Sequence, residues 1–144
     1  MRPIKLLLIE DNEGDILLTK EAFEQSKLIA QIDVVKDGMA GINYFKHILE
    51  DHSISLPELV LLDINLPKKN GQEVLQFIKS NEILKQIPVI MLTTSSSDND
   101  IINSYKNQAN CYIMKPVDIN TFMSVISKIE DFWLATAKLP FHKR

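Results

Sequence analysis

The sequence is poor in the features that mark secreted or membrane proteins. Only one of its 144 residues is a cysteine, Cys111, so a disulfide within the chain is excluded and a reducing compartment is expected. Its apolar runs are far shorter than the ~20 residues that a membrane-spanning helix requires. The first residues lack the cleavage site of a signal peptide. We therefore expect a cytoplasmic protein that does not cross a membrane.

Basic residues are too few to suggest binding to nucleic acid. The chain has 16 lysines and arginines against 19 aspartates and glutamates, which gives a formal net charge of -3. A nucleic-acid interface needs a basic face, and the clusters at 68–69 and 142–144 are too short to form one. Its 144 residues suit a single globular domain that buries its own core.

Short apolar stretches alternate with longer amphipathic ones along the whole chain. The apolar stretches are nearly continuous, which is typical of parallel strands covered on both faces. Repeated strand–helix units predict right-handed crossovers and a flavodoxin-like (βα)5 α/β fold, a doubly wound parallel sheet with strand order 2-1-3-4-5. We expect a domain over residues 1–135, closed by a helix over 118–135, and a loose tail over 136–144. The predicted strands are residues 4–9, 32–35, 59–62, 89–92 and 112–114.

Three carboxylates follow two of these strands. Glu10 and Asp11 follow the first strand and Asp63 follows the third. These strands are neighbours in the predicted order, so the carboxylates meet at one edge and repel one another unless a cation lies among them. Mg²⁺ prefers such oxygen ligands. Acidic residues that only stabilise the start of a helix are the alternative, and the coincidence with Asp63 favours the metal site.

A hydroxyl and an ammonium reach the same edge. Thr93 follows the fourth strand and Lys115 follows the fifth. Either residue alone is usually part of a solvated surface. Beside the carboxylates they form a set suited to phosphoryl transfer, because a carboxylate can act as nucleophile while a cation and a hydroxyl hold the transferred oxygens.

These residues lie in motifs that resemble the receiver domain of two-component response regulators. The resemblance covers residues 4–135, and its motifs together are very specific. It implies a phosphorelay switch, a signalling protein and not an enzyme. The matching motifs are LIEDN at 8–12, LLDINLP at 61–67, NG at 70–71, PVIMLT at 88–93 and YIMKP at 112–116.

The resemblance implies a role for each residue at this edge. Asp63 would be the phosphoacceptor, and Thr93 and Lys115 would each hold a phosphoryl oxygen. Mg²⁺ would be held by Asp11 and Asp63 directly, by Glu10 through water, and by the backbone carbonyl of Asn65.

Further roles come with the same resemblance. Tyr112 would be the rotameric switch that follows Thr93. Asn65 and Ser95 would tune how fast water removes the phosphoryl group. The bond between Lys115 and Pro116 would be cis.

A narrower resemblance is to the small response regulators paired with cyanobacterial phytochromes. It rests on NLPKKNG at 65–71, LTTS at 92–95, NCY at 110–112 and DFWL at 131–134. Such proteins are single receivers, usually homodimers, that signal through protein–protein contacts. The implied partner is a sensor histidine kinase, including phytochrome-like photoreceptors.

One departure from the family concerns the turn before the fifth strand. Family members often carry glycine there, and this chain has none between 107 and 111. Asn107 or Asn110 is the expected substitute in a left-handed conformation.

Three consecutive large apolar residues predict a second surface. Phe132, Trp133 and Leu134 span about 200° of a helix, so one core-facing stripe cannot bury them all. The alternative is a wide stripe with one exposed apolar residue, which is common. We expect a homodimer whose interface includes these residues.

Two other functions remain open on the sequence. A degenerate receiver would bind a partner without being phosphorylated, but every acidic position of the site is filled. A phosphohydrolase with an aspartyl phosphate usually carries a second aspartate two residues after the nucleophile, where this chain has Asn65.

Overall fold

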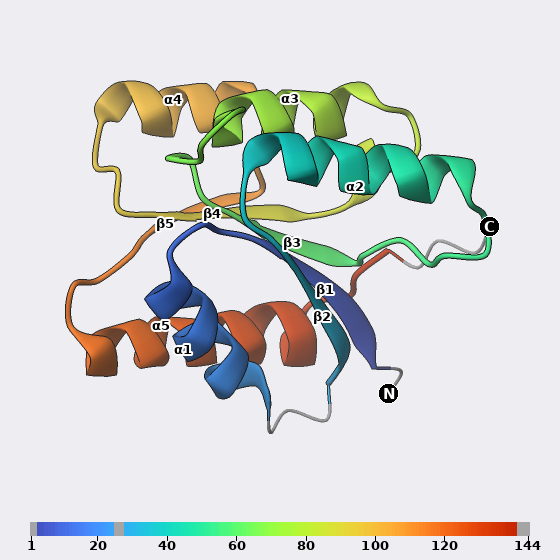
Figure 1. The fold of residues 1–144 in the computed structure, drawn as a ribbon. Helices are drawn as coiled ribbons and strands as arrows, with labels where there is room; N and C mark the ends of the chain where they lie inside the picture. The colour runs from blue at the N-terminus through green and yellow to red at the C-terminus, as the bar shows by residue number, and fades with distance from the viewer. Residues whose placement is uncertain (1–2, 25–27, 141–144) are drawn as a thin grey trace.

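The protein is described by a computed structural model over residues 3–24 and 28–140 (Figure 1). Five parallel strands form one sheet in the order β2-β1-β3-β4-β5, so the predicted fold and strand order are confirmed. The basic cluster at 142–144 lies outside the described residues. The strands are β1 Ile4–Ile9, β2 Ile29–Val35, β3 Leu59–Leu62, β4 Val89–Thr93 and β5 Cys111–Met114.

Helices cover both faces of the sheet. Helices α2, α3 and α4 lie on one face, and α1 and α5 lie on the other (Figure 1). Among the described residues no helix combines the length and the apolar character needed to span a bilayer. The helices are α1 Glu13–Glu24, α2 Gly38–Glu50, α3 Gly71–Ser80, α4 Asp98–Lys106 and α5 Ile119–Ile129, with short turns η1 Leu84–Gln86 and η2 Glu130–Thr136.

The sheet divides the hydrophobic core into two clusters. All six residues of β1 are buried, and alternate ones serve opposite faces. Leu7 packs with Phe45 under α2 and α3, whereas Leu8 packs with Phe122 under α1 and α5. This two-sided burial explains why the strands are nearly continuous apolar runs.

Two elements differ from their predicted bounds by more than one residue. Strand β2 begins at Ile29, before the predicted start at residue 32. The prediction was too short because β2 is an edge strand, in which polar residues such as Gln31 and Asp33 break up the apolar pattern. The last helix is α-helical only to Ile129 and continues as the π-helical turn η2. Beyond it Leu139 is partly buried against the α1–α5 core.

Two backbone expectations are wrong. Gln108, with φ of 71°, takes the left-handed conformation before β5, and neither candidate asparagine does. The side chain of Asn110 is instead engaged as an acceptor from Val89 N–H, at 2.8 Å, and from Lys79 Nζ. No peptide bond between described residues is cis, so Lys115–Pro116 is trans, the isomer that X–Pro bonds favour.

Candidate functional site

The candidate site lies at the carboxyl ends of four strands. Ile9 of β1 pairs with Leu62 of β3, so the next residues, Glu10 and Asp63, stand side by side. Thr93 ends β4, and the backbone N–H of Lys115, just after β5, donates to its carbonyl at 2.7 Å. The site opens as a cavity of about 470 Å³ lined by Glu10, Asp11, Asn12, Glu13, Asp15, Asp63, Asn65, Thr94 and Lys115.

The three predicted carboxylate ligands form a compact cluster. One oxygen from each of Glu10, Asp11 and Asp63 lies within 4.8 Å of the others. Glu10 and Asp63 are buried and Asp11 is exposed, so the cluster faces solvent on one side. Hard oxygen donors at this spacing, open on one side to water, suit a divalent cation.

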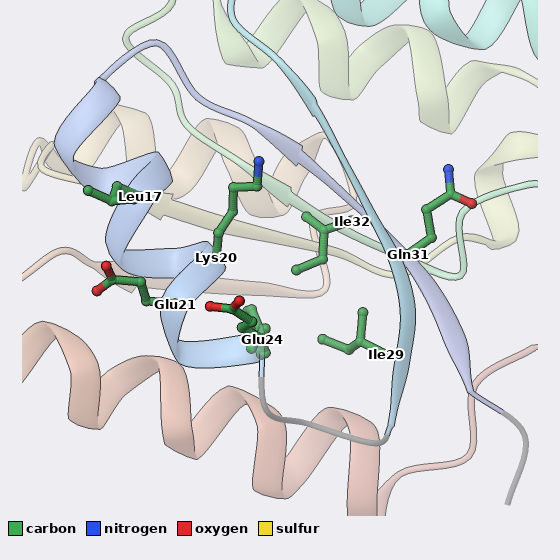
Figure 2. A pocket seen from close by; sticks show the side chains of 8 residues that line it. Leu17, Lys20, Glu21, Glu24, Ile29, Gln31 and Ile32 are labelled. Carbon is green, nitrogen blue, oxygen red and sulfur yellow. The ribbon is translucent and has the colours of Figure 1, made fainter.

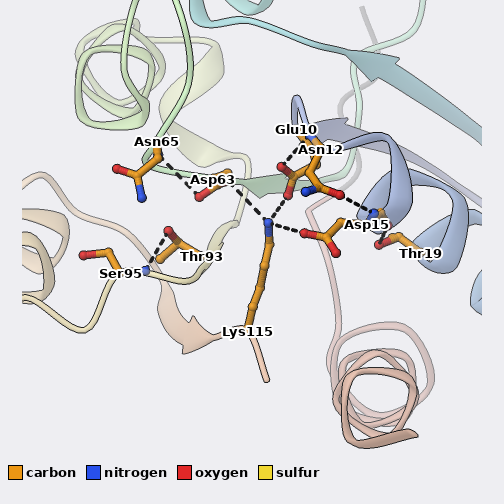
Figure 3. Close-up of polar contacts among 9 residues, drawn as sticks. All are labelled: Glu10, Asn12, Asp15, Thr19, Asp63, Asn65, Thr93, Ser95 and Lys115. Atoms are coloured by element: carbon orange, nitrogen blue, oxygen red, sulfur yellow. Dashed lines mark hydrogen bonds and ion pairs between the residues drawn. The ribbon is translucent and has the colours of Figure 1, made fainter. Parts of the chain in front are cut away.

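Lys115 supplies the positive charge of the site (Figure 3). Its ammonium is buried and makes ion pairs with Glu10, with Asp15 at 2.9 Å and with Asp63 at 3.3 Å. Burial lowers the pKa of this lysine, but the hydrogen bond to Glu10 and the charges of Asp63 and Glu10 outweigh it and raise the pKa. Lys115 therefore remains charged throughout the physiological pH range.

The pKa of the Glu10 carboxyl is strongly shifted. Burial raises its pKa to about 7, with the charge of Asp63 adding to the rise and Lys115 opposing it. Its second oxygen accepts from the backbone N–H of Asn12 at 3.1 Å. The metal-free site thus holds an unfavourable charge that a divalent cation would relieve.

The predicted switch residues meet at Ser95. Thr93 is fully buried, and its hydroxyl oxygen accepts from Ser95 N–H at 3.3 Å. The Tyr112 hydroxyl donates to the Ser95 carbonyl at 2.9 Å. Ser95 also donates from its own hydroxyl to Asp100 of α4 at 2.5 Å. The structure therefore links the hydroxyl at the site to the start of α4.

This chain of contacts continues into α3. Gln72 donates to the Asp100 carbonyl at 3.1 Å and to the Ser104 hydroxyl at 2.9 Å. The side chain of Asn107 donates to the side-chain amide oxygen of Gln72, Oε1, at 3.1 Å. Sequence reasoning missed these residues, since polar side chains on helices give no signal of their partners before the helices are packed.

The loop after β3 is fixed by the start of α3. Asn70 and Glu73 form a reciprocal capping box. Gly71 packs so closely that a Cβ atom there would lie 2.2 Å from the carbonyl oxygen of Asp63. The Asn70–Gly71 pair therefore holds the Asp63 loop in place, and only glycine fits at its second position.

The sequence-family model of the response regulator receiver domain matches residues 6–127 of this chain. The chain belongs to the response regulator receiver family. This chain and Response regulator Rcp1 of Synechocystis sp. are 40% identical over 138 residues. The alignment covers 96% of this chain and 94% of that protein. The chain shares 39% identity with the probable methanogenesis regulatory protein FilR2 of Methanothrix harundinacea, covering 96% and 88%.

Two solved structures extend the likeness to three dimensions. The Mn²⁺-bound form of Rcp1 matches with a TM-score of 0.90 at 40% identity, over 96% of this receiver and 99% of that chain. The phosphorylated cyanobacterial phytochrome response regulator RcpA matches with a TM-score of 0.91 at 44% identity, over 96% and 99%. The resemblance to cyanobacterial phytochrome response regulators is thus confirmed.

The three predicted dimer residues have different environments. Phe132 is 56% exposed, Trp133 is half-buried, and Leu134 is 7% exposed and packs in the core of its own receiver. Phe132 and Trp133 stack edge to face at 5.4 Å between ring centroids. The two aromatic residues border a groove of about 250 Å³ on α5 and β5, where a partner could contact them. Leu134 is buried in its own chain and is not available to a partner.

A second cavity lies away from the strand ends that carry the carboxylates. It measures about 500 Å³ and lies between α1 and the start of β2 (Figure 2). Leu17, Phe23, Ile29 and Ile32 provide its apolar wall, and Lys20 provides its cation. None of the predicted site residues lines it.

Proposed function

We propose that the protein is a stand-alone response regulator that accepts a phosphoryl group on Asp63 from the phosphohistidine of a sensor histidine kinase. The proposal is carried by one observation: the buried Asp63 carboxylate clusters with those of Glu10 and Asp11 in a small cavity and contacts the Lys115 ammonium. The match to the phosphorylated form of RcpA supports phosphorylation of this chain.

Magnesium is the proposed cofactor. Asp11 and Asp63 would hold it directly, Glu10 would hold it through water, and Asn65 would contribute its backbone carbonyl. When bound, the cation supplies neutralising charge for the phosphoryl oxygens and the crowded carboxylates. The match to the Mn²⁺-bound form of Rcp1 supports binding of a divalent cation by this chain.

The chain's own residues perform the transfer. An Asp63 carboxylate oxygen forms a bond to phosphorus while the bond from phosphorus to the kinase imidazole nitrogen breaks and its electron pair stays on that nitrogen. Lys115 lies beside Asp63 and offsets the negative charge that gathers on the phosphoryl oxygens. The deep burial of Asp63 limits the access of water to the product.

The phosphoryl group changes the protein through Thr93 and Tyr112. The Thr93 hydroxyl, which now accepts from Ser95 N–H, would donate to a phosphoryl oxygen, and movement of Thr93 toward that oxygen would disturb its contact with Ser95. A shift of the Ser95 backbone would in turn disturb the bond that its carbonyl accepts from the Tyr112 hydroxyl. Asn65 lines the cavity and Ser95 follows Thr94, which also lines it, so both are placed to tune hydrolysis of the acyl phosphate.

The proposed partners are a kinase and a second copy of the chain. The likeness to phytochrome response regulators favours a phytochrome-like sensor histidine kinase in the cytoplasm. A homodimer would form through Phe132 and Trp133, and the output would be a change in protein–protein contacts. The net charge of -3 gives no support for nucleic acid as a partner.

Incubation with acetyl phosphate and Mg²⁺, followed by intact-mass and peptide analysis, tests the proposal. We expect a gain of one phosphoryl group on the peptide that carries Asp63, and none when Mg²⁺ is removed with a chelator. Absence of any adduct would indicate a degenerate receiver. Rapid turnover of many equivalents of a phosphoester would indicate a phosphohydrolase.

A further inference from the structure

Asp15 gives the site a carboxylate that no predicted role requires. It lies in the first turn of α1, on a different element from every proposed metal ligand. Its Oδ2 is 2.9 Å from Lys115 Nζ, and its side chain is about one quarter exposed. Figure 3 shows it reaching from the helix toward the ammonium.

Local helix capping does not account for this orientation. Asn12 caps α1, because its side chain accepts from the backbone N–H of Asp15 at 2.9 Å. In a capping box the residue at the Asp15 position would accept in return from the N–H of the cap. Here Glu10 accepts from the Asn12 N–H instead, at 3.1 Å. The Asp15 side chain is thereby left for Lys115.

Lys115 consequently has no spare donor. An ammonium offers three, and they are directed to Glu10, Asp15 and Asp63. The contact to Asp63, at 3.3 Å, is longer than the contact to Asp15, at 2.9 Å. The proposed function needs the ammonium at Asp63, where the phosphoryl oxygens would appear, and Asp15 holds it toward α1.

A bound cation would sharpen this competition. Glu10 and Asp63 belong to the carboxylate cluster that suits a divalent cation, whereas Asp15 does not belong to it. Asp15 is therefore the partner of Lys115 that a cation leaves unchanged. Its negative charge also favours a cation in the cavity and disfavours an added anion.

We infer that Asp15 is a positioning residue that competes with the phosphoryl group for Lys115 and so limits the stability of the phosphorylated state. This inference rests on the proposed function of the site. In the resting protein Asp15 and Lys115 form a partly exposed pair. On phosphorylation part of that pairing is given up, which lowers the net gain from the new contact between Lys115 and phosphate.

The test compares binding of beryllofluoride, a mimic of the phosphoryl group, by wild type, Asp15→Asn and Glu13→Gln at saturating Mg²⁺. Glu13 is the matched control, because it lies in the same helical turn and lines the same cavity but pairs with Lys36 at 2.6 Å. We expect Asp15→Asn to bind about fivefold more tightly than wild type. Glu13→Gln should change the affinity by less than about twofold, since its charge is exposed and screened.

Further measurements separate contact from charge and from folding. Mg²⁺ titration without beryllofluoride should show weaker binding by Asp15→Asn, because a negative charge leaves the cavity. Asp15→Ser, which removes the carboxylate with a different shape, should reproduce the tighter beryllofluoride binding. Circular dichroism and thermal unfolding verify that each variant is folded.

Each outcome has a definite reading. Unchanged or weaker beryllofluoride binding by folded Asp15→Asn and Asp15→Ser would overturn the inference. An equal gain in Glu13→Gln would also overturn it, because general charge and not contact with Lys115 would then be responsible. Failure of the wild type to bind beryllofluoride would instead contradict the proposed function.

Discussion

At the scale of single residues, the site is a balance between like charges and one lysine. Asp63 is buried beside Glu10 and Asp11, and Lys115 contacts it at 3.3 Å. A neutral side chain of the same shape would keep the packing and remove part of the repulsion. The proposed phosphoacceptor is therefore a residue whose charge would serve function at the expense of stability.

Asp63→Asn is expected to abolish phosphorylation by acetyl phosphate and to raise stability without Mg²⁺ by about 1 kcal/mol, or a few degrees in Tm. Calorimetry in the presence of a chelator measures the stability. Asp33→Asn is the matched control, because burial raises the pKa of Asp33 but hydrogen bonds from Gln31 and Tyr44 and the charge of Lys5 lower it overall. Neutralising Asp33 should therefore destabilise the protein. Full labelling of Asp63→Asn would contradict the assignment of the phosphoacceptor.

Glu10 makes the stability of the metal-free protein depend on pH. Its pKa is raised from an ordinary 4.5 to about 7, chiefly by burial, so the folded state binds a proton that the unfolded state releases. Its stabilising contribution is complete below about pH 4.5 and is lost as the pH rises through about 7. We expect urea unfolding to show about 1 kcal/mol less stability at pH 8 than at pH 6. Glu10→Gln should remove most of that difference, and an equal slope in the variant would refute the assignment.

The residues at strand ends could be predicted from the sequence, and their helical neighbours could not. Glu10, Asp63, Thr93 and Lys115 each follow an apolar run, and parallel strands bring those positions to one edge whatever the details of packing. Asp15 joins them only because α1 starts with a particular rotation about its axis. That rotation depends on the cap at Asn12 and on packing, which no local pattern encodes.

At the scale of secondary structure, the turn between β3 and α3 shows how an element positions the chemistry. Gly71 begins α3 against the backbone of Asp63, with its N–H donating to the Ile64 carbonyl at 2.8 Å. The capping box of Asn70 and Glu73 fixes the direction of the helix. The loop that follows Asp63 is thus held between a strand and the start of a helix.

Gly71→Ala is expected to destabilise the protein by about 1–3 kcal/mol and to weaken Mg²⁺ binding, because the added Cβ would lie 2.2 Å from the Asp63 carbonyl oxygen. Urea unfolding and Mg²⁺ calorimetry measure the two effects. Gly14→Ala makes the same change in the first turn of α1, where the Cβ would lie 3.3 Å from Asn12 Oδ1, a contact that a small shift of that side chain relieves. That control should remain as stable as the wild type. A Gly71→Ala protein with normal Mg²⁺ affinity would show that the loop is positioned by other contacts.

The elements themselves followed from apolar patterning wherever a strand is central. Strands β1, β3 and β4 have both faces covered, so their apolar runs coincide with their bounds to within one residue. Strand β2 lies at an edge and carries Gln31 and Asp33, so its first half was missed. The directions of the side chains from Phe132 to Leu134 were also not predicted. These residues lie in the π-helical η2, where side chains point in other directions than in a regular α-helix.

At the scale of the whole molecule, the proposed homodimer rests on an aromatic pair, the exposed Phe132 and the half-buried Trp133. Phe132 and Trp133 stack on each other beside a groove that includes Ile113 and Val125. Trp133 also packs on the core of its own receiver, whereas Phe132 is 56% exposed. Phe132 is thus the better choice for a mutation that affects association and leaves folding intact.

Phe132→Ala is expected to weaken a homodimer by tenfold or more, because an aromatic anchor at an interface is worth about 1.4 kcal/mol or more. Sedimentation velocity across a concentration series measures association, with and without beryllofluoride. Ile83→Ala is the matched control, since Ile83 is 47% exposed but lies beside η1, outside the groove. A wild type that stays monomeric at high concentration in both states would refute the dimer. A dimer indifferent to beryllofluoride would leave the interface and remove its coupling to phosphorylation.

The central position of β1 also divides the molecule by the rate of amide hydrogen exchange. Its amides are buried and paired to β2 on one side and β3 on the other, so they should exchange only through global unfolding. The amides of the exposed residues that directly follow β1, beginning at Asp11, should exchange through local opening. The carboxylates therefore lie at the boundary between slowly and rapidly exchanging amides. Mg²⁺ and beryllofluoride should therefore extend slow exchange across that boundary into the loops around Asp11 and Asn65.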